Sequence, residues 1–253
     1  MARYGVLGDI HGNREALDAV LRTLDASGVE RLLCVGDIVG YNADPDECVA
    51  LIRERRALAI AGNHDLISLR RLGFRRCSNI AEYALRRTRR NIAPDSTAFL
   101  AALPDSRTLE EGVVLVHGGV RDVQQYMVAP LHIRQNAQYL RADFPGARLC
   151  FFGHSHEQKV YEVTADEVRE VGASGRVVLD PALLYFINAG SVDAARKSRH
   201  KLAECAVLDS TAWTVEFLRV PYDAAAAEVK AAVYGYRIGP WSERWYALRR
   251  RIY

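Results

Sequence analysis

Long apolar runs are missing from this sequence. No uninterrupted apolar stretch approaches the roughly 18 residues that a membrane-spanning helix requires, and the chain enters the apolar run at residues 4–7 directly after Met1, Ala2 and Arg3. The charged segment followed by an apolar one that marks a secretory leader does not occur there. We therefore expect a soluble protein with a cytoplasmic location and no membrane partner.

Cysteine is scarce, and the net charge is small. The five cysteines lie far apart without a C-x-x-C pair, which excludes a disulfide-rich miniprotein and predicts buried, reduced thiols. They are Cys34, Cys48, Cys77, Cys150 and Cys205. The 34 Lys and Arg residues exceed the 31 Asp and Glu residues by only three charges, too few to indicate a nucleic-acid partner by themselves.

Short apolar runs alternate with helical patterns through the first half of the 253 residues. Apolar side chains recur at helical spacing over Arg14–Ala26, and Asp44-Pro45 suits the opening of a second helix over residues 46–56. Strands are expected at residues 4–7, 31–35, 57–60, 113–116 and 149–152. Strands that alternate with crossover helices favour an α/β fold.

The last third of the chain has a different pattern. Apolar runs at residues 184–187, 204–208 and 213–218 follow one another with little helix between them, which predicts antiparallel pairing. No internal repeat or low-complexity linker marks a boundary, so we predict a single domain over residues 1–253.

Two segments of this domain differ in composition from the rest. One is an arginine-rich helical segment near residues 66–103. The other is a tail near residues 221–253, which contains a helix at Ala224–Val233 and then an aromatic, basic end. We expect the aromatic side chains of this end to pack on the domain and its charges to stay in water.

Polar residues and glycines directly follow five of the predicted strands. These loops are residues 8–13, 36–37, 61–65, 117–119 and 153–156. Because strand carboxyl ends share one edge of an α/β sheet, the loops should converge on one crevice. Five of the seven histidines lie in them, His11, His64, His117, His154 and His156, whereas His132 and His200 are expected at the surface.

The candidate ligands in these loops outnumber the needs of one tetrahedral ion. Without His64, they are Asp9, His11, Asp37, Asn63, His117, His154 and His156. This set predicts two divalent transition-metal ions, and its mixture of nitrogen and oxygen favours Mn, Fe, Zn or Ni over Ca. Two such ions roughly 3.5–4 Å apart activate a bridging water and stabilise both the attacking and the leaving oxygen of an in-line phosphoryl displacement. Neither a G-x-S-x-G elbow nor a Walker A loop is present, so the sequence favours a metal-dependent phosphoester hydrolase.

The motifs that hold these residues carry a family resemblance. In chain order they are Asp9-x-His11, Gly36-Asp37, Gly62-Asn63-His64-Asp65, His117 and Gly153-His154-x-His156. The set resembles the calcineurin-like metallophosphoesterase superfamily, and residues 38–45 and 186–192 resemble its small bacterial single-domain, phosphodiesterase-type branch. The resemblance covers at least residues 5–222.

The resemblance implies a four-layer αββα sandwich, with two mixed sheets inside and helices outside. It assigns one metal to Asp9, His11, Asp37 and His156, and the other to Asp37, Asn63, His117 and His154. His64 inherits the position of a catalytic residue that faces the phosphate and protonates or stabilises the leaving oxygen. Family analogy favours phosphodiester over phosphomonoester hydrolysis, with a small phosphoester as substrate.

Two departures lie close together. Relatives commonly have Asn-Pro-Gly-Ser where this chain has Asn188-Ala189-Gly190-Ser191, and glycine where Asp193 stands. We expect a looser loop there but no loss of a ligand.

Other hypotheses remain open. A binding scaffold of the same fold that has lost catalysis would have damaged ligands, and this set is intact. A nuclease-like enzyme could use the eight arginines between positions 70 and 90, but we favour a solvated helical face, because Ala81, Ala84, Leu85 and Thr88 form an inward stripe that most of these arginines avoid. An intermediate alternative places one or two of these arginines in the crevice. The sequence does not determine the oligomeric state.

Four polar residues near the motifs have two interpretations each. Asp65 either orients His64 or caps the helix that follows. Asn13 either lies near the substrate or begins the helix at Arg14. Asp122 and Tyr126 either line the pocket or only secure their own loop.

Overall fold

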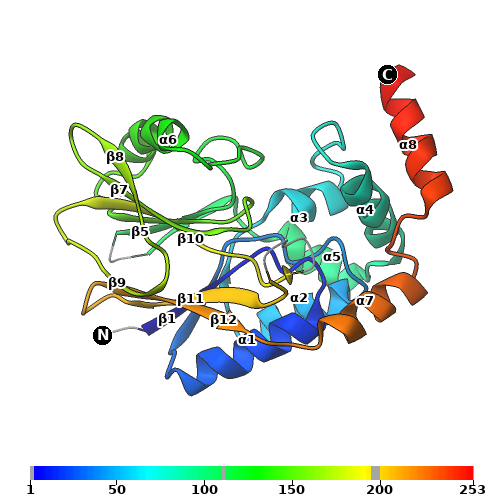
Figure 1. Cartoon of the computed structure of the whole chain (residues 1–253), viewed down its shortest axis with the longest axis horizontal. Coiled ribbons are helices and arrows are strands. Elements are labelled where there is room, and N and C mark those ends of the chain that lie inside the picture. The colour runs from blue at the N-terminus through cyan, green and yellow to red at the C-terminus, as the bar shows by residue number, and fades with distance from the viewer. Residues whose placement is uncertain (1–2, 110–111, 195–199, 253) are drawn as a thin grey trace.

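The computed structural model describes residues 3–109, 112–194 and 200–252. Two six-stranded mixed sheets stack face to face, with helices on their outer sides, as Figure 1 shows. Sheet A has the order β3 (Leu58–Ala59), β2 (Arg31–Cys34), β1 (Arg3–Leu7), β11 (Ala203–Asp209), β12 (Thr214–Val220) and β9 (Gly175–Val178). Sheet B has the order β4 (Ser106–Thr108), β5 (Val113–Val116), β6 (Leu149–Phe152), β10 (Leu184–Ala189), β7 (Gln158–Val163) and β8 (Val168–Val171). The predicted αββα sandwich is confirmed.

Strand direction changes along the chain as the sequence predicts, except at β10, which was expected to pair antiparallel and pairs in parallel with β6 and antiparallel with β7. The early strands β1, β2 and β3 pair in parallel, and so do β5 and β6. The late strands β11 and β12 form an antiparallel ladder that also pairs β1 with β11 and β12 with β9. Helical crossovers therefore place the carboxyl ends of the early strands together, whereas the late strands extend both sheets.

Alternating side chains of the central strands fill two different cores. In β6, Leu149 and Phe151 enter the core between the sheets, while Cys150 and Phe152 face the helix on the other side of sheet B. Both faces of these strands are buried, which explains their continuous apolar sequences. Burial of each large side chain stabilises the fold by roughly 1.5–3 kcal/mol. The predicted buried state of all five cysteines is confirmed, and none of them forms a disulfide.

The helices fall into three groups. Helices α1 (Arg14–Ala26), α2 (Pro45–Glu54) and α5 (Pro94–Ala101) pack on sheet A, and α6 (Pro130–Asp143) packs on sheet B. The remaining helices gather at one end of the sandwich in Figure 1. They are α3 (Asn63–Ser68), α4 (Asn79–Asn91), α7 (Ala224–Val233) and α8 (Pro240–Ile252). Among the described residues, none of these helices has the length and apolar character needed to span a membrane.

The aromatic side chains of α8 do not all pack on the domain, and that expectation is wrong for both tryptophans. Trp241 is 82% exposed and Trp245 is 55% exposed, whereas Tyr246 is buried against Tyr83 of α4. Helix α8 touches the body mainly through α4 (Figure 1), and among the side chains of α8 that the structure describes, Tyr246 is the buried one. Neighbouring residues on a helix point about 100° apart, and the two tryptophans therefore stay in water.

The loop in which the sequence departs from its relatives, at Ala189 and Asp193, is held in place by hydrogen bonds. The backbone N–H groups of Val192 and Asp193 donate to the carbonyl oxygens of Gly8 and Asp9 at 3.1 and 3.0 Å. The side chain of Asn13 donates to the Asp193 carboxylate at 2.9 Å. The expectation of a looser loop is wrong, because Asp193 supplies a buried acceptor that a glycine could not.

Asn13 is a structural residue, so its replacement by alanine should lower stability. Its side-chain oxygen accepts from the Ala16 N–H at 3.1 Å and caps α1, while its amide donates to Asp193. We expect Asn13→Ala to lower the free energy of unfolding by about 2–3 kcal/mol, measured by urea denaturation. Asp223→Ala, which removes only the cap of α7, is the matched control and should cost about 1 kcal/mol. Equal losses in the two variants would show that the contact with Asp193 adds nothing.

Candidate metal centre

The seven predicted metal ligands and His64 come together at one end of the sandwich. They follow β1, β2 and β3 of sheet A and β5 and β6 of sheet B, so both sheets contribute loops, rather than one sheet edge. Seven of the eight side chains are buried, and His156 is only 11% exposed. Five of the predicted ligands have positive φ angles, Asp9, His11, Asp37, His154 and His156. Side chains other than glycine rarely adopt this backbone conformation, which concentrates at functional sites.

Asp37 lies at the centre of the cluster. Its Oδ2 is 3.4 Å from Nε2 of His117 and 3.8 Å from Nε2 of His11. Its Oδ1 accepts a hydrogen bond from the backbone N–H of His64 at 2.7 Å, whereas Oδ2 is buried and makes no hydrogen bond. Asp37 therefore has predicted ligands on both sides. A hydrogen bond fixes its Oδ1, and its Oδ2 is available to bind a cation.

One group of predicted ligands combines Asp9, His11 and His156. Nε2 of His156 lies 3.5 Å from Oδ1 of Asp9 and 3.1 Å from Nε2 of His11. The Asp9 carboxylate also accepts the backbone N–H of His154, which ties the loop after β6 to the loop after β1. Three donor atoms thus face one point between two sheets.

The second group combines Asp37, Asn63, His117 and His154. Nε2 of His117 lies 3.0 Å from Oδ1 of Asn63, and Nδ1 of His117 lies 2.7 Å from the carbonyl oxygen of Val35. Nδ1–H donates to that carbonyl, which leaves Nε2 to act as a ligand. Nε2 of His154 is buried and without a hydrogen bond.

Opposite charges set the electrostatics of the cluster. Burial alone would raise the pKa of Asp37, but the imidazoles of His117, His64 and His11 hold it well below its usual value. Burial would lower the pKa of His117, yet the Asp37 carboxylate raises it to about 9. Burial, reinforced by His117, lowers the pKa of His154 to about 3. Because a metal ligand must be deprotonated, the raised pKa of His117 opposes metal binding there and the lowered pKa of His154 favours it.

These residues fit a pair of divalent cations. In each of three groups, the donor atoms lie within 4.8 Å of one another, and neighbouring groups share His11 or Asp37: Asp9–His11–His156, His11–Asp37–His64 and Asp37–His117–His154. The donors are imidazole nitrogens and carboxylate oxygens without thiolates, which suits borderline transition metals. Buried atoms at Asp37 Oδ2 and His154 Nε2 that make no hydrogen bond are what a cation would satisfy.

Comparison with known proteins agrees with this geometry. Residues 2–212 match the calcineurin-like phosphoesterase superfamily domain. The chain belongs to this superfamily. An uncharacterized protein from Methanocaldococcus jannaschii is 32% identical over 230 residues, which cover 89% of this chain and 90% of that protein.

Two solved structures of similar size share the fold of this chain. A metallophosphoesterase from Sphaerobacter thermophilus has a TM-score of 0.74 and 28% identity, over 97% of this chain and 98% of that one. A hypothetical protein from Pyrococcus horikoshii has a TM-score of 0.73 over 96% of this chain and 97% of that one. Its 17% identity supports a likeness of fold alone.

His64 lies in the first turn of α3, beside the predicted ligands. Its ring centroid is 4.6 Å from that of His11 and 4.8 Å from that of Tyr41. A Cβ at Gly40 would lie 2.5 Å from Nδ1 of His64 and 2.8 Å from Nδ1 of His11, so only glycine fits behind these rings. Gly40 and Tyr41 were missed as site residues, although the segment that contains them, residues 38–45, carried part of the family resemblance.

Asp65 caps its helix and braces a loop. Its Oδ2 accepts from the Gly62 N–H at 2.9 Å, and its Oδ1 accepts from the N–H groups of Ile38 and Val39 at 3.0 and 3.1 Å. Of the two interpretations, the geometry favours the cap. Burial and the charge of Asp37 raise the pKa of Asp65 to about 7.

A small cavity of about 50 Å³ opens beside the ligands. Five of the predicted site residues line it, together with Tyr41, Arg76, Ser78 and Tyr126: Asp37, Asn63, His64, His154 and His156. The Tyr126 ring lies 4.0 Å from the His154 ring and is half exposed. Asp122 holds its own loop by accepting from Arg76 and from the Gln124 N–H. Tyr126 thus lines the pocket, while Asp122 secures the loop.

The arginine-rich segment divides into several environments. Ala81, Ala84, Leu85 and Thr88 of α4 are buried, so the predicted inward stripe is confirmed. Arg86 and Arg89 stack on Phe74, at 4.5 and 4.1 Å from its ring centroid. Arg76 reaches the cavity, and this outcome agrees with the intermediate alternative of one or two arginines in the crevice.

His132 and His200 lie outside the metal centre. Both are partly buried, and each has a local contact: His132 Nδ1 accepts from the Val128 N–H, and His200 lies 3.3 Å from Glu204. Neither faces the ligand cluster, although neither is fully exposed.

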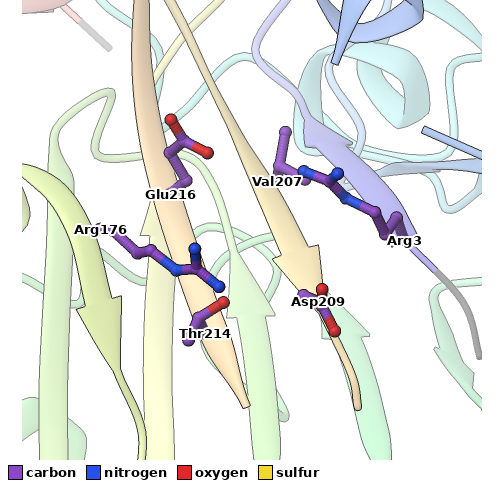
Figure 2. Close-up of a pocket in the computed structure, with 6 residues that line it drawn as sticks. All are labelled: Arg3, Arg176, Val207, Asp209, Thr214 and Glu216. Carbon is purple, nitrogen blue, oxygen red and sulfur yellow. The ribbon is translucent and has the colours of Figure 1, made fainter. Parts of the chain in front are cut away.

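A larger hollow of about 250 Å³ lies on sheet A, and Figure 2 shows its lining. The six labelled residues come from β1, β9, β11 and β12: Arg3, Arg176, Val207, Asp209, Thr214 and Glu216. This lining mixes cations and carboxylates and has neither imidazole nor thiol, so it lacks the nitrogen ligands that the candidate metal centre offers.

Proposed function

We propose that this phosphoesterase hydrolyses phosphodiesters, and phosphomonoesters less well, with two divalent transition metals. Asp9, His11, Asp37 and His156 would hold one ion, and Asp37, Asn63, His117 and His154 the other. The observation that carries the proposal is the position of Asp37, which lies within 4 Å of imidazoles from both groups. Ions bound there supply Lewis acidity and an activated water.

The side chains of the protein would orient the metal ligands and donate a proton to the leaving oxygen. Val35 fixes the tautomer of His117, and the backbone N–H of His64 fixes the Asp37 carboxylate, so the donor set is organised in advance. His64 lines the cavity and would protonate the leaving oxygen. A cavity of about 50 Å³ suits a phosphate group with the rest of a small substrate outside.

Two observations weigh against the other hypotheses. A silent scaffold has no need of five ligand residues held at positive φ, because such strain is costly without a function. A nucleic-acid groove needs arginines that can reach phosphates, and three of the eight in this segment, Arg76, Arg86 and Arg89, already bind Asp122, Glu82 and a backbone carbonyl.

The proposal is tested by removing and restoring the metal. Protein stripped with a chelator should not hydrolyse bis-p-nitrophenyl phosphate, and addition of Mn²⁺ should restore turnover. A parallel assay with p-nitrophenyl phosphate should give a lower kcat/KM. If the Mn²⁺-loaded protein binds two ions per chain but turns over neither ester, the scaffold hypothesis replaces this one. Salt-sensitive cleavage of oligonucleotides in preference to both esters would favour the nuclease.

A further inference from the structure

The chain beyond the matched family domain returns to the metal centre. That domain ends at residue 212, whereas Arg237 lies in the turn between α7 and α8. Its guanidinium donates from Nη1 to the carbonyl oxygen of Tyr41 at 2.9 Å and from Nη2 to Oδ1 of Asn42 at 3.0 Å. A residue from the C-terminal segment therefore holds the loop that follows β2.

Asn42, which accepts from Arg237, also donates two hydrogen bonds to the predicted ligand His11. Its side-chain Nδ2 donates to the carbonyl oxygen of His11 at 3.2 Å, and its backbone N–H donates to the same oxygen at 2.8 Å. His11 has a φ of +53°, a conformation that its surroundings must enforce. A continuous chain of hydrogen bonds thus runs from Arg237 through Asn42 to the backbone of His11.

Tyr41 links the same guanidinium to the pocket by packing. Its side chain is 6% exposed, and its ring meets the rings of His11 and His64 at 4.7 and 4.8 Å between centroids. Tyr41 also lines the cavity. A shift of the Tyr41 backbone would therefore move the wall against which both imidazoles rest.

The C-terminal segment is itself anchored, so it can act as a support. Glu228 of α7 accepts from Nε and Nη2 of Arg237, at 2.8 and 2.6 Å, and balances its charge. Lys230 of α7 donates to Asp44 at 2.8 Å. Tyr236 is buried in one apolar cluster with Tyr41. The planar guanidinium bridges three partners at once, which a lysine cannot do.

We propose that Arg237 is a positioning residue for the reaction, and that it acts through Tyr41 and Asn42 on His11 and His64. The inference rests on the proposed function, since it concerns the same site. Arg237 itself does not line the cavity, so its loss should change the rate of the chemical step more than the binding of substrate.

The test compares Arg237→Gln with Arg169→Gln. Arg169 also pairs with a carboxylate, Glu162, but lies on the edge strand β8 away from the site. In Mn²⁺-loaded protein, Arg237→Gln should lower kcat for bis-p-nitrophenyl phosphate about 10-fold or more, because small displacements of reacting groups are costly, with little change in KM. Arg237→Lys should recover only part of the loss, and Arg169→Gln should match the wild type.

Two further measurements separate positioning from general stability. Hydrogen exchange of peptides that cover residues 38–44 should accelerate in Arg237→Gln and not in Arg169→Gln, with or without metal. The variants Arg237→Gln and Asn42→Ala should be non-additive: the kcat loss in the double variant should be smaller than the product of the two single losses.

The outcomes distinguish this inference from the proposed function. If the wild type shows no turnover, the proposed function is wrong. Hydrogen exchange then still tests whether Arg237 stabilises residues 38–44. An active wild type with a folded Arg237→Gln variant of unchanged kcat and unchanged exchange overturns the positioning role. Losses in kcat that multiply in the double variant would overturn the route through Asn42.

Discussion

Replacement of Asp37 by asparagine should abolish most of the turnover of bis-p-nitrophenyl phosphate, with a loss on the order of 10³-fold. Among the described residues, Asp37 is the carboxylate that approaches both groups of predicted ligands, with Oδ2 3.4 Å from Nε2 of His117 and 3.8 Å from Nε2 of His11. Two adjacent cations repel each other, and the negative charge of Asp37 offsets part of this repulsion. The asparagine variant lacks that charge and should bind the pair of ions less tightly. The bound metal per chain, measured by elemental analysis, should fall below two.

Asparagine is the right substitution because it preserves the local backbone. Asp37 has a φ of +55°, a conformation that asparagine tolerates better than alanine. The amide oxygen can still accept the His64 N–H that Asp37 Oδ1 now accepts. The loss of activity should therefore come from the missing charge, and circular dichroism should match the wild type.

Asp143→Asn is the matched control for Asp37→Asn. Asp143 pairs with Arg121 at the surface, on the far end of α6, and contributes nothing to the cavity. It should leave both turnover and metal content unchanged. Full activity and two bound ions in Asp37→Asn would refute the shared-ligand arrangement.

The convergence of the ligands could be predicted because each of them directly follows a buried strand. Val6 and Leu7 of β1, like Phe151 and Phe152 of β6, alternate between two cores, so the register of each strand is fixed by burial. Fixed strands then fix the start of each loop. The sequence could not show that these loops come from two sheets, because stacking of sheets depends on contacts between distant residues.

Some helices and strands could not be predicted, because their sequences have neither a capping side chain nor a regular apolar pattern. Helix α6 starts after Ala129, which offers no capping side chain, and β8 and β9 are short strands with charged residues on the solvent side. The support from Arg237 was also missed. It lies 196 residues from Tyr41 and 195 from Asn42, and no periodic pattern connects them.

Replacement of His64 by glutamine should slow the reaction according to the leaving group. If His64 protonates the leaving oxygen, esters with a strongly basic alkoxide leaving group should lose about 10²–10⁴-fold in kcat. Bis-p-nitrophenyl phosphate should lose far less, since p-nitrophenolate leaves readily without a proton. The steepness of this dependence, measured over a series of aryl and alkyl phosphodiesters, is the readout.

The metal content of the His64 variant decides between two roles. His64 lies close enough to His11 and Asp37 to count among the groups that could hold an ion. As a proton donor, it can be replaced without loss of metal, and His64→Gln should retain two ions per chain. His132→Gln, on α6 outside the cluster, should be indistinguishable from the wild type. Loss of one ion, together with an equal loss of rate for all leaving groups, would show that His64 is a ligand instead.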